Sequence, residues 1–266
     1  PSKKDVTIAA DGSTVVEYRY TRNSYTVTFV PYNGSDNIVQ TLKYGATIKP
    51  PALSKTGHTF TGWDKTVAKT MPANNLAYEA NWEKNTYSVS FDSNGGENPA
   101  SITATYGEKY GELPEPKREG YTFLGWYTSE VDNVGYGTLI DENTIVSTTS
   151  AQILYAKWSG NPKTPYTIKH YQENIDGIRY IIIFGKEIPI GIAATLKEEE
   201  NRTGTAGTEV TPEVKNYAGF TSPNKKTVTI GGDGKTVVEY YYTRNKYKLT
   251  FKSENGNKDI VTTVKY

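Results

Sequence analysis

The first 44 residues recur at residues 223–266 without any insertion or deletion, so the chain repeats itself at a constant offset of 222 residues. Of the 44 aligned positions, 27 are identical. A fixed internal period constrains the fold more than any local motif does, because such repeats are built from small units placed in series. The sequence therefore predicts one full period of an array, followed by the start of the next period.

A shorter pattern inside this period marks the start of three similar units. It consists of a basic residue, Asn, any residue and Tyr, followed by an apolar residue and Phe at alternate positions. Copies occupy residues 22–29, 84–91 and 244–251. The Tyr, the apolar residue and the Phe would share one face of a strand, with Ser, Thr or Lys on the other. Each unit is therefore predicted to open with a strand that has one buried face.

The units that begin at Tyr25 and Tyr87 align further along their length. Gly-x-Thr-Phe-x-Gly-Trp occupies residues 57–63 and 120–126, and Ala-x-Trp occupies residues 80–82 and 156–158. These motifs hold all four tryptophans of the chain. The second unit is longer, with extra residues around 130–150. The sequence thus predicts two sister units within one period.

A different unit follows the proline-flanked segment 161–165 and ends in a tyrosine-rich strand. Its alternate positions are identical in both copies of the long repeat, whereas Arg19 corresponds to Tyr241 on the other face. A position that accepts either Arg or Tyr is expected to face solvent. The opposite face, predicted to be buried, carries Val16, Tyr18 and Tyr20 in one copy and Val238, Tyr240 and Tyr242 in the other.

These boundaries predict five modules joined by very short linkers. The segments between them contain no Gly/Ser-rich stretch, so restricted joints are expected. Residues 1–23 would end one module of the tyrosine-rich type, and residues 24–84 and 85–160 would be the sister modules. Residues 161–244 would form a complete tyrosine-rich module with an apolar insertion near residues 181–194, and residues 245–266 would begin another module of the first type.

The Gly-x-Thr-Phe-x-Gly-Trp and Ala-x-Trp motifs closely resemble those of the Listeria–Bacteroides repeat, or internalin B-repeat. The tyrosine-rich unit resembles a mucin-binding-protein (MucBP) domain. The resemblance rests on residues 203–208, on the Tyr-Ala-Gly-Phe run at 217–220 and on the tyrosine-rich strand. Both resemblances imply a β-rich α+β fold of ubiquitin-like β-grasp modules in an elongated array. They also imply an exported, often wall-anchored protein of a Gram-positive bacterium, and they bring no catalytic residues.

Composition excludes several classes of protein. The net charge of +1 and the 22% content of charged residues argue against a nucleic-acid partner, which would require a basic face. Cysteine is absent, so disulfides and thiolate metal sites are excluded. No stretch approaches the roughly 20 apolar residues that a transmembrane helix needs, so no such segment is expected. Neither a signal peptide nor an anchor is recognised, and both chain ends fall inside a repeat.

Residues that could carry chemistry do not form a recognisable catalytic set. His58 corresponds to Tyr121 of the sister unit and is interpreted as a half-buried aromatic position, and His170 as structural or exposed. The glycine-rich runs are interpreted as turns, because neither precedes a phosphate-binding helix. The glutamates at 198–200 are interpreted as a solvated charge run rather than a calcium site. An isopeptide bond from Lys169 is disfavoured, and no catalytic, cofactor or metal site is predicted.

Two features remain as candidate contacts for a ligand or partner. Trp63 and Trp126 either pack in a core or between modules, or offer a stacking face to a sugar. The insertion forms an additional hairpin on its own module, a protruding partner-binding loop or an engineered segment. Its candidate contact residues are Ile181, Ile183, Phe184, Ile188 and Ile190.

The sequence therefore favours a non-enzymatic stalk segment of a bacterial surface adhesin that projects or multiplies binding sites. In the alternative, the segment itself binds host glycan or glycoprotein through Tyr/Trp surfaces or the loop at 178–194. Neighbouring surface-protein chains are further possible partners, and a hydrolase is the least favoured reading. The expected location is the extracellular cell surface, with wall anchoring through regions outside residues 1–266.

Overall fold

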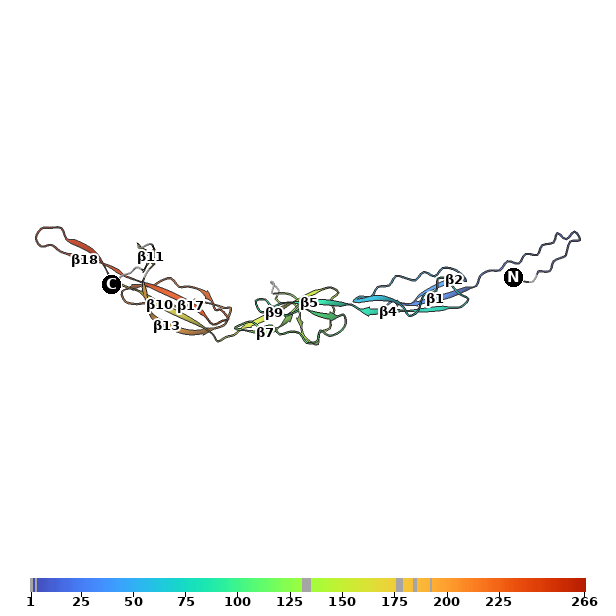
Figure 1. Cartoon of the computed structure of the whole chain (residues 1–266), viewed down its shortest axis with the longest axis horizontal. Coiled ribbons are helices and arrows are strands. Elements are labelled where there is room, and N and C mark those ends of the chain that lie inside the picture. The colour runs from blue at the N-terminus through green and yellow to red at the C-terminus, as the bar shows by residue number, and fades with distance from the viewer. Residues whose placement is uncertain (1, 3, 131–134, 176–178, 184–185, 192) are drawn as a thin grey trace. The chain divides into compact units, whose positions relative to one another are not determined.

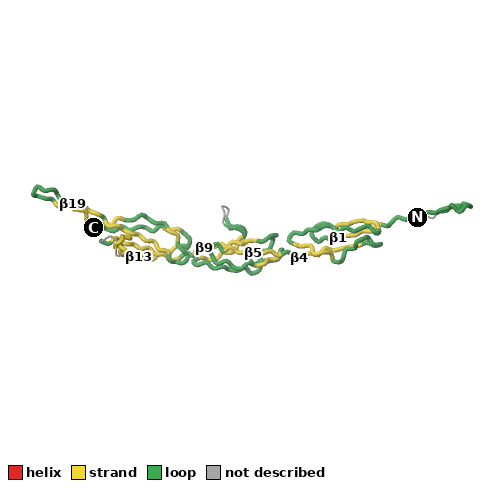
Figure 2. Tube along the Cα trace, turned by 45° about the horizontal axis from the view of Figure 1, so that its top comes forward, coloured by secondary structure: helices red, strands yellow, loops and turns green. Residues whose placement is uncertain are grey.

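A computed structural model describes residues 2, 4–130, 135–175, 179–183, 186–191 and 193–266. All regular elements in these residues are β-strands, and none is a helix (Figure 2). The expectation of a β-rich chain is confirmed. The helix implied by an α+β β-grasp fold is absent from the described residues, so that part of the expectation is wrong. These residues accordingly contain no helix long and apolar enough to cross a membrane.

The first sheet, called sheet I, is built from four strands in the order β2-β1-β4-β3. Figure 1 labels β1, β2 and β4 of this sheet. Their bounds are Ser24–Val30 for β1, Ile38–Lys43 for β2, His58–Trp63 for β3 and Leu76–Lys84 for β4. Strand β1 pairs antiparallel with β2 and parallel with β4. Sheet I is therefore mixed, with a parallel pair at its centre.

The parallel pairing of β1 with β4 explains why a helix was expected and how the chain does without one. Parallel neighbours need a long crossover, which is usually a helix. Here residues 44–75 make the crossover through turns and β3. Pro50 and Pro51 lack the amide donors that a helix interior needs, and Gly57 adopts a positive φ of 67°. These residues favour an extended, turning path over a helix.

One face of β1 forms the core of sheet I, as its alternating pattern predicts. Val27 and Phe29 are fully buried, and the Phe29 ring lies 5.6 Å from that of Tyr78 on β4. Ile48 and Met71 of the crossover complete this buried cluster. The crossover thus covers the sheet face that a helix would otherwise cover.

Sheet II has five strands in the order β6-β5-β9-β7-β8. Their bounds are Thr86–Asp92 for β5, Ile102–Thr105 for β6, Tyr121–Tyr127 for β7, Leu139–Ile140 for β8 and Gln152–Gly160 for β9. Strand β7 pairs antiparallel with both β8 and β9. The irregular pairing at Phe123/Gly125 repeats the one at Phe60/Gly62 in sheet I, in agreement with the sister relationship predicted from the motifs.

The chain divides into two compact units, and the division passes through sheet II. The first unit comprises residues 1–89, 101–112 and 142–152, and the second comprises residues 90–100, 113–141 and 153–266. Within sheet II, the first unit buries Val89, Ala104 and Val146. The second unit buries Phe91, Trp126, Ile140, Leu154 and Ala156.

Sheet III, in the second unit, has the order β13-β10-β17-β15. Its strands span Thr164–Glu173 (β10), Ala194–Gly204 (β13), Phe220–Thr221 (β15) and Thr236–Arg244 (β17). Strand β10 pairs antiparallel with β13 and parallel with β17, as in the centre of sheet I. Two short strands, Glu209–Val210 (β14) and Val228–Thr229 (β16), pair with each other. A further hairpin joins Arg179–Ile183 (β11) to Lys186–Gly191 (β12).

Strand β17 confirms the predicted inward face of the tyrosine-rich strand. Val238, Tyr240 and Tyr242 are at most 1% exposed, whereas Tyr241 between them is 46% exposed. The inward tyrosines retain polar partners, because the hydroxyl of Tyr240 donates to the carbonyl of Pro212 at 2.7 Å. Burial and hydrogen bonding of these rings together anchor β17 in the sheet.

The repeated sequence has a different environment at the two ends of the chain. The predicted burial of Val16, Tyr18 and Tyr20 in the first copy is wrong. Their exposed fractions are 43%, 43% and 79%, although the equivalents Tyr240 and Tyr242 are buried. The described residues before Ser24 form no strand, so these rings lack the neighbouring strand that covers β17. The last 21 residues form an antiparallel hairpin of Lys246–Phe251 (β18) and Ile260–Lys265 (β19).

Candidate functional site

The four tryptophans form two matching aromatic clusters, one in each sister sheet. In sheet I, the ring of Phe60 lies 5.3 Å from Trp63 and 5.5 Å from Trp82. In sheet II, the corresponding distances from Phe123 are 5.3 Å to Trp126 and 5.4 Å to Trp158. The repeated Phe-x-Gly-Trp and Ala-x-Trp motifs thus place the same three rings together in both sheets.

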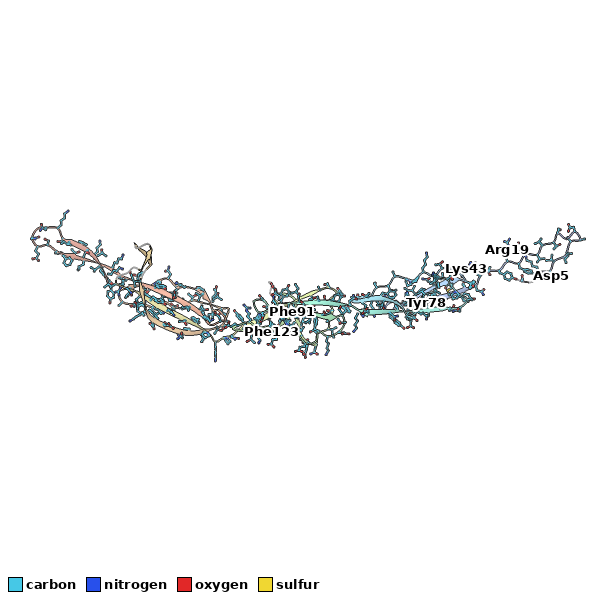
Figure 3. The ribbon with its side chains drawn as sticks, viewed as in Figure 1. Asp5, Arg19, Lys43, Tyr78, Phe91 and Phe123 are labelled. Carbon is cyan, nitrogen blue, oxygen red and sulfur yellow. The ribbon has the colours of Figure 1, made fainter. Side chains whose placement is uncertain are left out.

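Trp126 is positioned to stabilise sheet II. Its indole is only 2% exposed, and its Nε1–H donates to the carbonyl of Pro114 at 2.7 Å. Phe91, labelled with Phe123 in Figure 3, lies 4.7 Å from Trp126 between ring centres. A sugar ring needs an open indole face, so this burial supports the packing interpretation of Trp126.

Trp63 has a more open position than Trp126 but also belongs to a core. It is partly buried, and its ring lies 4.8 Å from that of Phe29. Its neighbour in the cluster, Trp82, uses its Nε1–H to donate to the carbonyl of Pro31 at 2.7 Å. Both tryptophans therefore contribute to the packing of sheet I.

The apolar insertion is described only in its backbone. Strands β11 and β12 pair antiparallel, with Ile181 opposite Ile188, so the insertion contains a hairpin. Whether this hairpin packs on its own module or protrudes as a partner-binding loop stays a prediction. Ile183 and Ile190 lie in the same two strands. Phe184 lies outside the described residues. The proposed role of these five side chains in binding stays a prediction.

Charged side chains of sheet III form an ion-pair network on one side of β13. Lys215 contacts both Glu198 and Glu200, with 2.6 Å between its Nζ and the Glu200 Oε1. Arg202 also pairs with Glu200, at 2.6 Å. Glu199, on the opposite face, lies 3.6 Å from Lys169. The alternation of faces agrees with the sequence argument. The interpretation as a solvated charge run holds for Glu198, whose side chain is 42% exposed, but it is wrong for Glu200, whose side chain is only 15% exposed.

These contacts shift the protonation of the network toward its charged forms. The ammonium of Lys215, assisted by the guanidinium of Arg202, lowers the pKa of Glu200 to about 2. The carboxylates of Glu198 and Glu200 raise the pKa of Lys215 in turn. Burial, followed by the hydrogen bond to Glu198, raises the pKa of Tyr217 to about 12. Glu200 and Lys215 stay ionised and Tyr217 stays neutral around neutral pH, which fits a structural network better than proton transfer.

His170 lies fully buried beside this network. Its Nδ1 is 2.9 Å from the hydroxyl of Tyr242, and its Nε2 is 3.3 Å from a Glu200 oxygen without making a hydrogen bond. The structural interpretation of His170 is confirmed. His58 is half-buried as expected, with its ring 5.8 Å from that of Tyr106. In the described part of the chain, no group of three or more His, Asp or Glu side chains could hold a metal ion.

The most regular polar arrangement lies where one sheet ends and the next begins, and we call each such contact a joint. At the joint of Asn85, its N–H donates to the carbonyl of Gly57 at 2.9 Å. Its side-chain Oδ1 accepts the hydroxyl of Thr59 at 2.6 Å. Its own carbonyl accepts the N–H of Tyr106 at 2.9 Å. One asparagine therefore binds both the preceding and the following part of the chain.

The joint at Asn161, between sheets II and III, contains the same three bonds. The Asn161 N–H donates to Gly120 at 2.9 Å, and its Oδ1 accepts the Thr122 hydroxyl at 2.9 Å. The Asn161 carbonyl accepts the N–H of Ala206 at 3.1 Å. These partners occupy the same places in the hydrogen-bond pattern as Gly57, Thr59 and Tyr106 do around Asn85.

The joint at Asn245, between sheet III and the hairpin β18–β19, repeats the arrangement once more. Its distances are 2.8 Å to the carbonyl of Gly219, 2.7 Å to the hydroxyl of Thr221 and 3.0 Å to the amide of Tyr266. Arg244 adds a short hydrogen bond to the carbonyl of Tyr266. All three joints thus share a Gly-x-Thr segment on one side and a backbone amide on the other.

The glycine of each joint meets the following part of the chain at close range. Gly57, Gly120 and Gly219 have positive φ angles of 67°, 76° and 81°. A Cβ added at Gly57 would lie 2.1 Å from the Tyr106 ring, and one at Gly219 would lie 1.7 Å from the Tyr266 ring. At Gly120, it would lie 2.3 Å from the backbone of Gly232. Only glycine fits these positions, for reasons of both backbone conformation and space.

The two halves of the joint at Asn85 lie in separate motifs of the sequence. Asn85 and Asn245 belong to the strand-opening pattern, whereas the Gly-x-Thr segments at 57–59 and 120–122 belong to the tryptophan motif. The signal that could have joined them is their shared recurrence at Asn85 and Asn161, each preceded by Gly-x-Thr in the same unit. Their contact depends on how the chain returns to the sheet edge, which no local pattern shows.

The sheets can be compared with known proteins. Two similar proteins come from Evansella cellulosilytica. A "putative membrane protein" is 35% identical over 53% of this chain and 22% of its own length. A "putative Gly-rich membrane protein" is 33% identical over 52% of this chain and 17% of its own length. Internalin H of Listeria monocytogenes is 32% identical over 42% of this chain and 21% of its own length. The chain spans about a fifth of the length of these curated relatives.

The family model of the Listeria-Bacteroides repeat domain matches two stretches, residues 25–79 and 87–157. The first lies within sheet I and the second within sheet II. Each match ends before the asparagine of the following joint. The resemblance inferred from the tryptophan motifs is confirmed for these two stretches, each of which matches the model of the Listeria-Bacteroides repeat domain.

Proposed function

We propose that this chain is a non-enzymatic stalk or spacer segment of a bacterial surface adhesin, which projects or multiplies binding regions carried elsewhere. The observation that carries the proposal is the double occurrence of the Listeria-Bacteroides repeat domain inside a period of 222 residues. Repeated modules serve either to span distance or to multiply weak contacts. Similarity to internalin H and to two proteins named as membrane proteins supports a location at the cell surface.

The proposed organisation is an elongated array of five modules with the boundaries deduced from the sequence. Sheets I to III and the hairpin β18–β19 fall within residues 24–84, 85–160, 161–244 and 245–266, respectively. Residues 161–244 would be a MucBP-like module, as their resemblance implies. Attachment to the cell wall would depend on regions outside residues 1–266.

The charged groups of sheet III support a role without chemistry. Glu198, Glu200, Lys215 and Arg202 neutralise one another, and the neighbouring His170 is fully buried. A catalytic centre instead needs titratable groups that converge on an accessible pocket. The network is therefore better explained as an internal brace between β13 and the segment that carries Lys215.

A second candidate function is binding of host glycan or glycoprotein by the outward face of sheet III. Tyr171 of β10 and Tyr241 of β17 stack with ring centres 4.8 Å apart and an interplanar angle of 10°. Both hydroxyls donate to the carboxylate of Glu239, at 3.3 and 3.1 Å. Tyr241 is 46% exposed. Aromatic rings beside a carboxylate suit a sugar, which offers apolar C–H faces and hydroxyl groups.

A glycan and glycoprotein array probed with the 266-residue chain separates the two functions. The spacer proposal predicts no saturable binding above that of a chain with Tyr171→Ala and Tyr241→Ala. Saturable binding that this double substitution abolishes would favour the second function instead. Lys248→Ala, on exposed strand β18, is the matched control and should leave any signal unchanged.

A further inference from the structure

We infer that the asparagine joint is a common connector, a single set of contacts that fixes successive sheets to one another whatever their type. The three joints link a sister sheet to a sister sheet, sheet II to sheet III, and sheet III to the hairpin β18–β19. Their nine hydrogen bonds nevertheless fall within 2.6–3.1 Å and use the same atoms of asparagine. The inference concerns the joints alone and holds whether the chain is a spacer or a binder.

The chemistry of the joint explains how it can serve different neighbours. On the upstream side it needs only a glycine carbonyl and a threonine hydroxyl, supplied by Gly-x-Thr at the start of β3, β7 or β15. On the downstream side it needs only a backbone N–H, which Tyr106, Ala206 and Tyr266 all provide. A tyrosine and an alanine serve equally because the bond does not involve their side chains.

The downstream half of the joint forms independently of the upstream half. At the start of sheet I, the N–H of Tyr44 donates to the carbonyl of Asn23 at 2.9 Å, as in the other joints. Arg22 donates to the carbonyl of Tyr44 at 3.2 Å, as Arg244 does to that of Tyr266. The asparagine is therefore held by the sheet that it precedes. Its N–H and Oδ1 can then bind any preceding unit that carries a suitable Gly-x-Thr segment.

Close packing at the glycine adds a constraint that hydrogen bonds alone would not supply. Three linked bonds around one residue limit rotation, and the contact of Gly57 with the Tyr106 ring leaves no space for displacement toward that ring. At Gly120, the backbone of Gly232 leaves no space for displacement of the glycine in that direction. A short linker without such contacts would behave as a flexible segment. We therefore expect each joint to restrict the motion of the two segments that it connects.

The test uses pulsed electron–electron double resonance to measure distances across two joints in the full 266-residue chain. The chain has no cysteine, so pairs of spin labels can be attached at introduced cysteines without further changes. Labels at Thr41 and Thr103, both exposed, span the joint at Asn85. Labels at Ile153 and Lys197, also exposed, span the joint at Asn161. Both pairs are expected to give a single narrow distance distribution.

Replacing the glycine of a joint with alanine should disrupt that joint and leave the other joint intact. With Gly57→Ala, the distribution between Thr41 and Thr103 should broaden about twofold or more, as for a flexible linker, while the second pair is unchanged. With Gly120→Ala, the effects on the two pairs should be reversed. Gly34→Ala is the matched control, because Gly34 has a positive φ of 92° but no atom within 4 Å of its added Cβ. It should also strain the backbone, but without broadening either distribution.

A milder variant tests the same joint in case the Gly57→Ala chain does not fold. Thr59→Val removes the hydroxyl that Asn85 accepts and leaves the glycine in place. It should accelerate hydrogen exchange at the Asn85 amide about tenfold while the amides of β1 keep their protection. The inference is overturned if the unaltered chain gives broad distributions, if Gly34→Ala broadens them as much as Gly57→Ala, or if only one of the two joints responds. It is equally overturned if Thr59→Val leaves the Asn85 amide unchanged.

Discussion

Replacing Phe29 with alanine is expected to lower the free energy of unfolding of sheet I by about 3–5 kcal/mol. The Phe29 ring is fully buried and lies 4.8 Å from Trp63 and 5.6 Å from Tyr78. Its removal would leave a cavity between β1, β4 and the crossover, where close-packed neighbours relax only in part. Urea denaturation followed through the amide signals of β1 and β4 would measure the effect on this sheet alone.

The long repeat provides a matched control for Phe29. Phe251 occupies the same place one period later, yet its side chain is 54% exposed on β18. Phe251→Ala is therefore expected to change the free energy of unfolding of sheet I by less than about 0.5 kcal/mol. Equal losses for Phe29→Ala and Phe251→Ala would contradict the assignment of Phe29 to the core of sheet I.

Trp126→Ala is expected to destabilise sheet II by about 3–5 kcal/mol. The substitution removes a ring that packs against Phe91 and Phe123, and it deprives the carbonyl of Pro114 of its indole donor. An unsatisfied buried acceptor adds to the cost of the cavity. Thermal unfolding monitored at the amides of β7 and β9 would give the change in stability.

Two comparisons sharpen the prediction for Trp126. Trp126→Phe retains part of the packing and should cost less than Trp126→Ala. Leu124→Ala, on the same strand but with a side chain 46% exposed, should cost less than about 0.5 kcal/mol. A Trp126→Ala protein with unaltered unfolding but with lost binding to a glycan would instead restore the stacking interpretation of this residue.

Much of the strand content and its inward faces could be predicted from the sequence. Alternation in the strand-opening pattern identified Val27 and Phe29 as a buried pair, because side chains two residues apart share one face of a strand. At β17, the long repeat identified which face of the strand is buried and which is exposed. The exchange of Arg19 for Tyr241 marked the solvent face, and Tyr240 and Tyr242 are indeed buried on the other face.

The helix expected from the β-grasp resemblance could not be tested by local pattern. The parallel pairing of β1 with β4 joins residues about 50 positions apart, such as Val27 and Leu76, and local periodicity does not report pairings of this kind. Pro50 and Pro51 disfavour a helix in the crossover, but no prediction was drawn from them. A resemblance to a family carried more weight in that expectation than the chemistry of the intervening residues.

The candidate sites were predicted less completely than the strands. The motif around Trp126 could serve packing or binding, and only its burial favours packing. The ion pairs of Glu198 and Glu200 could not be predicted from the sequence, because their partner Lys215 lies some 15 residues further along the chain. The joints were missed for the same reason, since Asn85 meets Gly57 and Thr59 only after β3 and β4 have paired.

Small-angle X-ray scattering of the 266-residue chain in solution tests the central claim most directly, because a spacer must extend. A compact chain of this length would have a radius of gyration of about 18 Å. The proposed array predicts a radius of gyration well above this value, together with a circular dichroism spectrum typical of folded β-structure. The scattering profile should be changed by Gly57→Ala but not by Gly34→Ala. A radius of gyration near 18 Å would contradict the account, because the modules would then be packed together rather than placed in series.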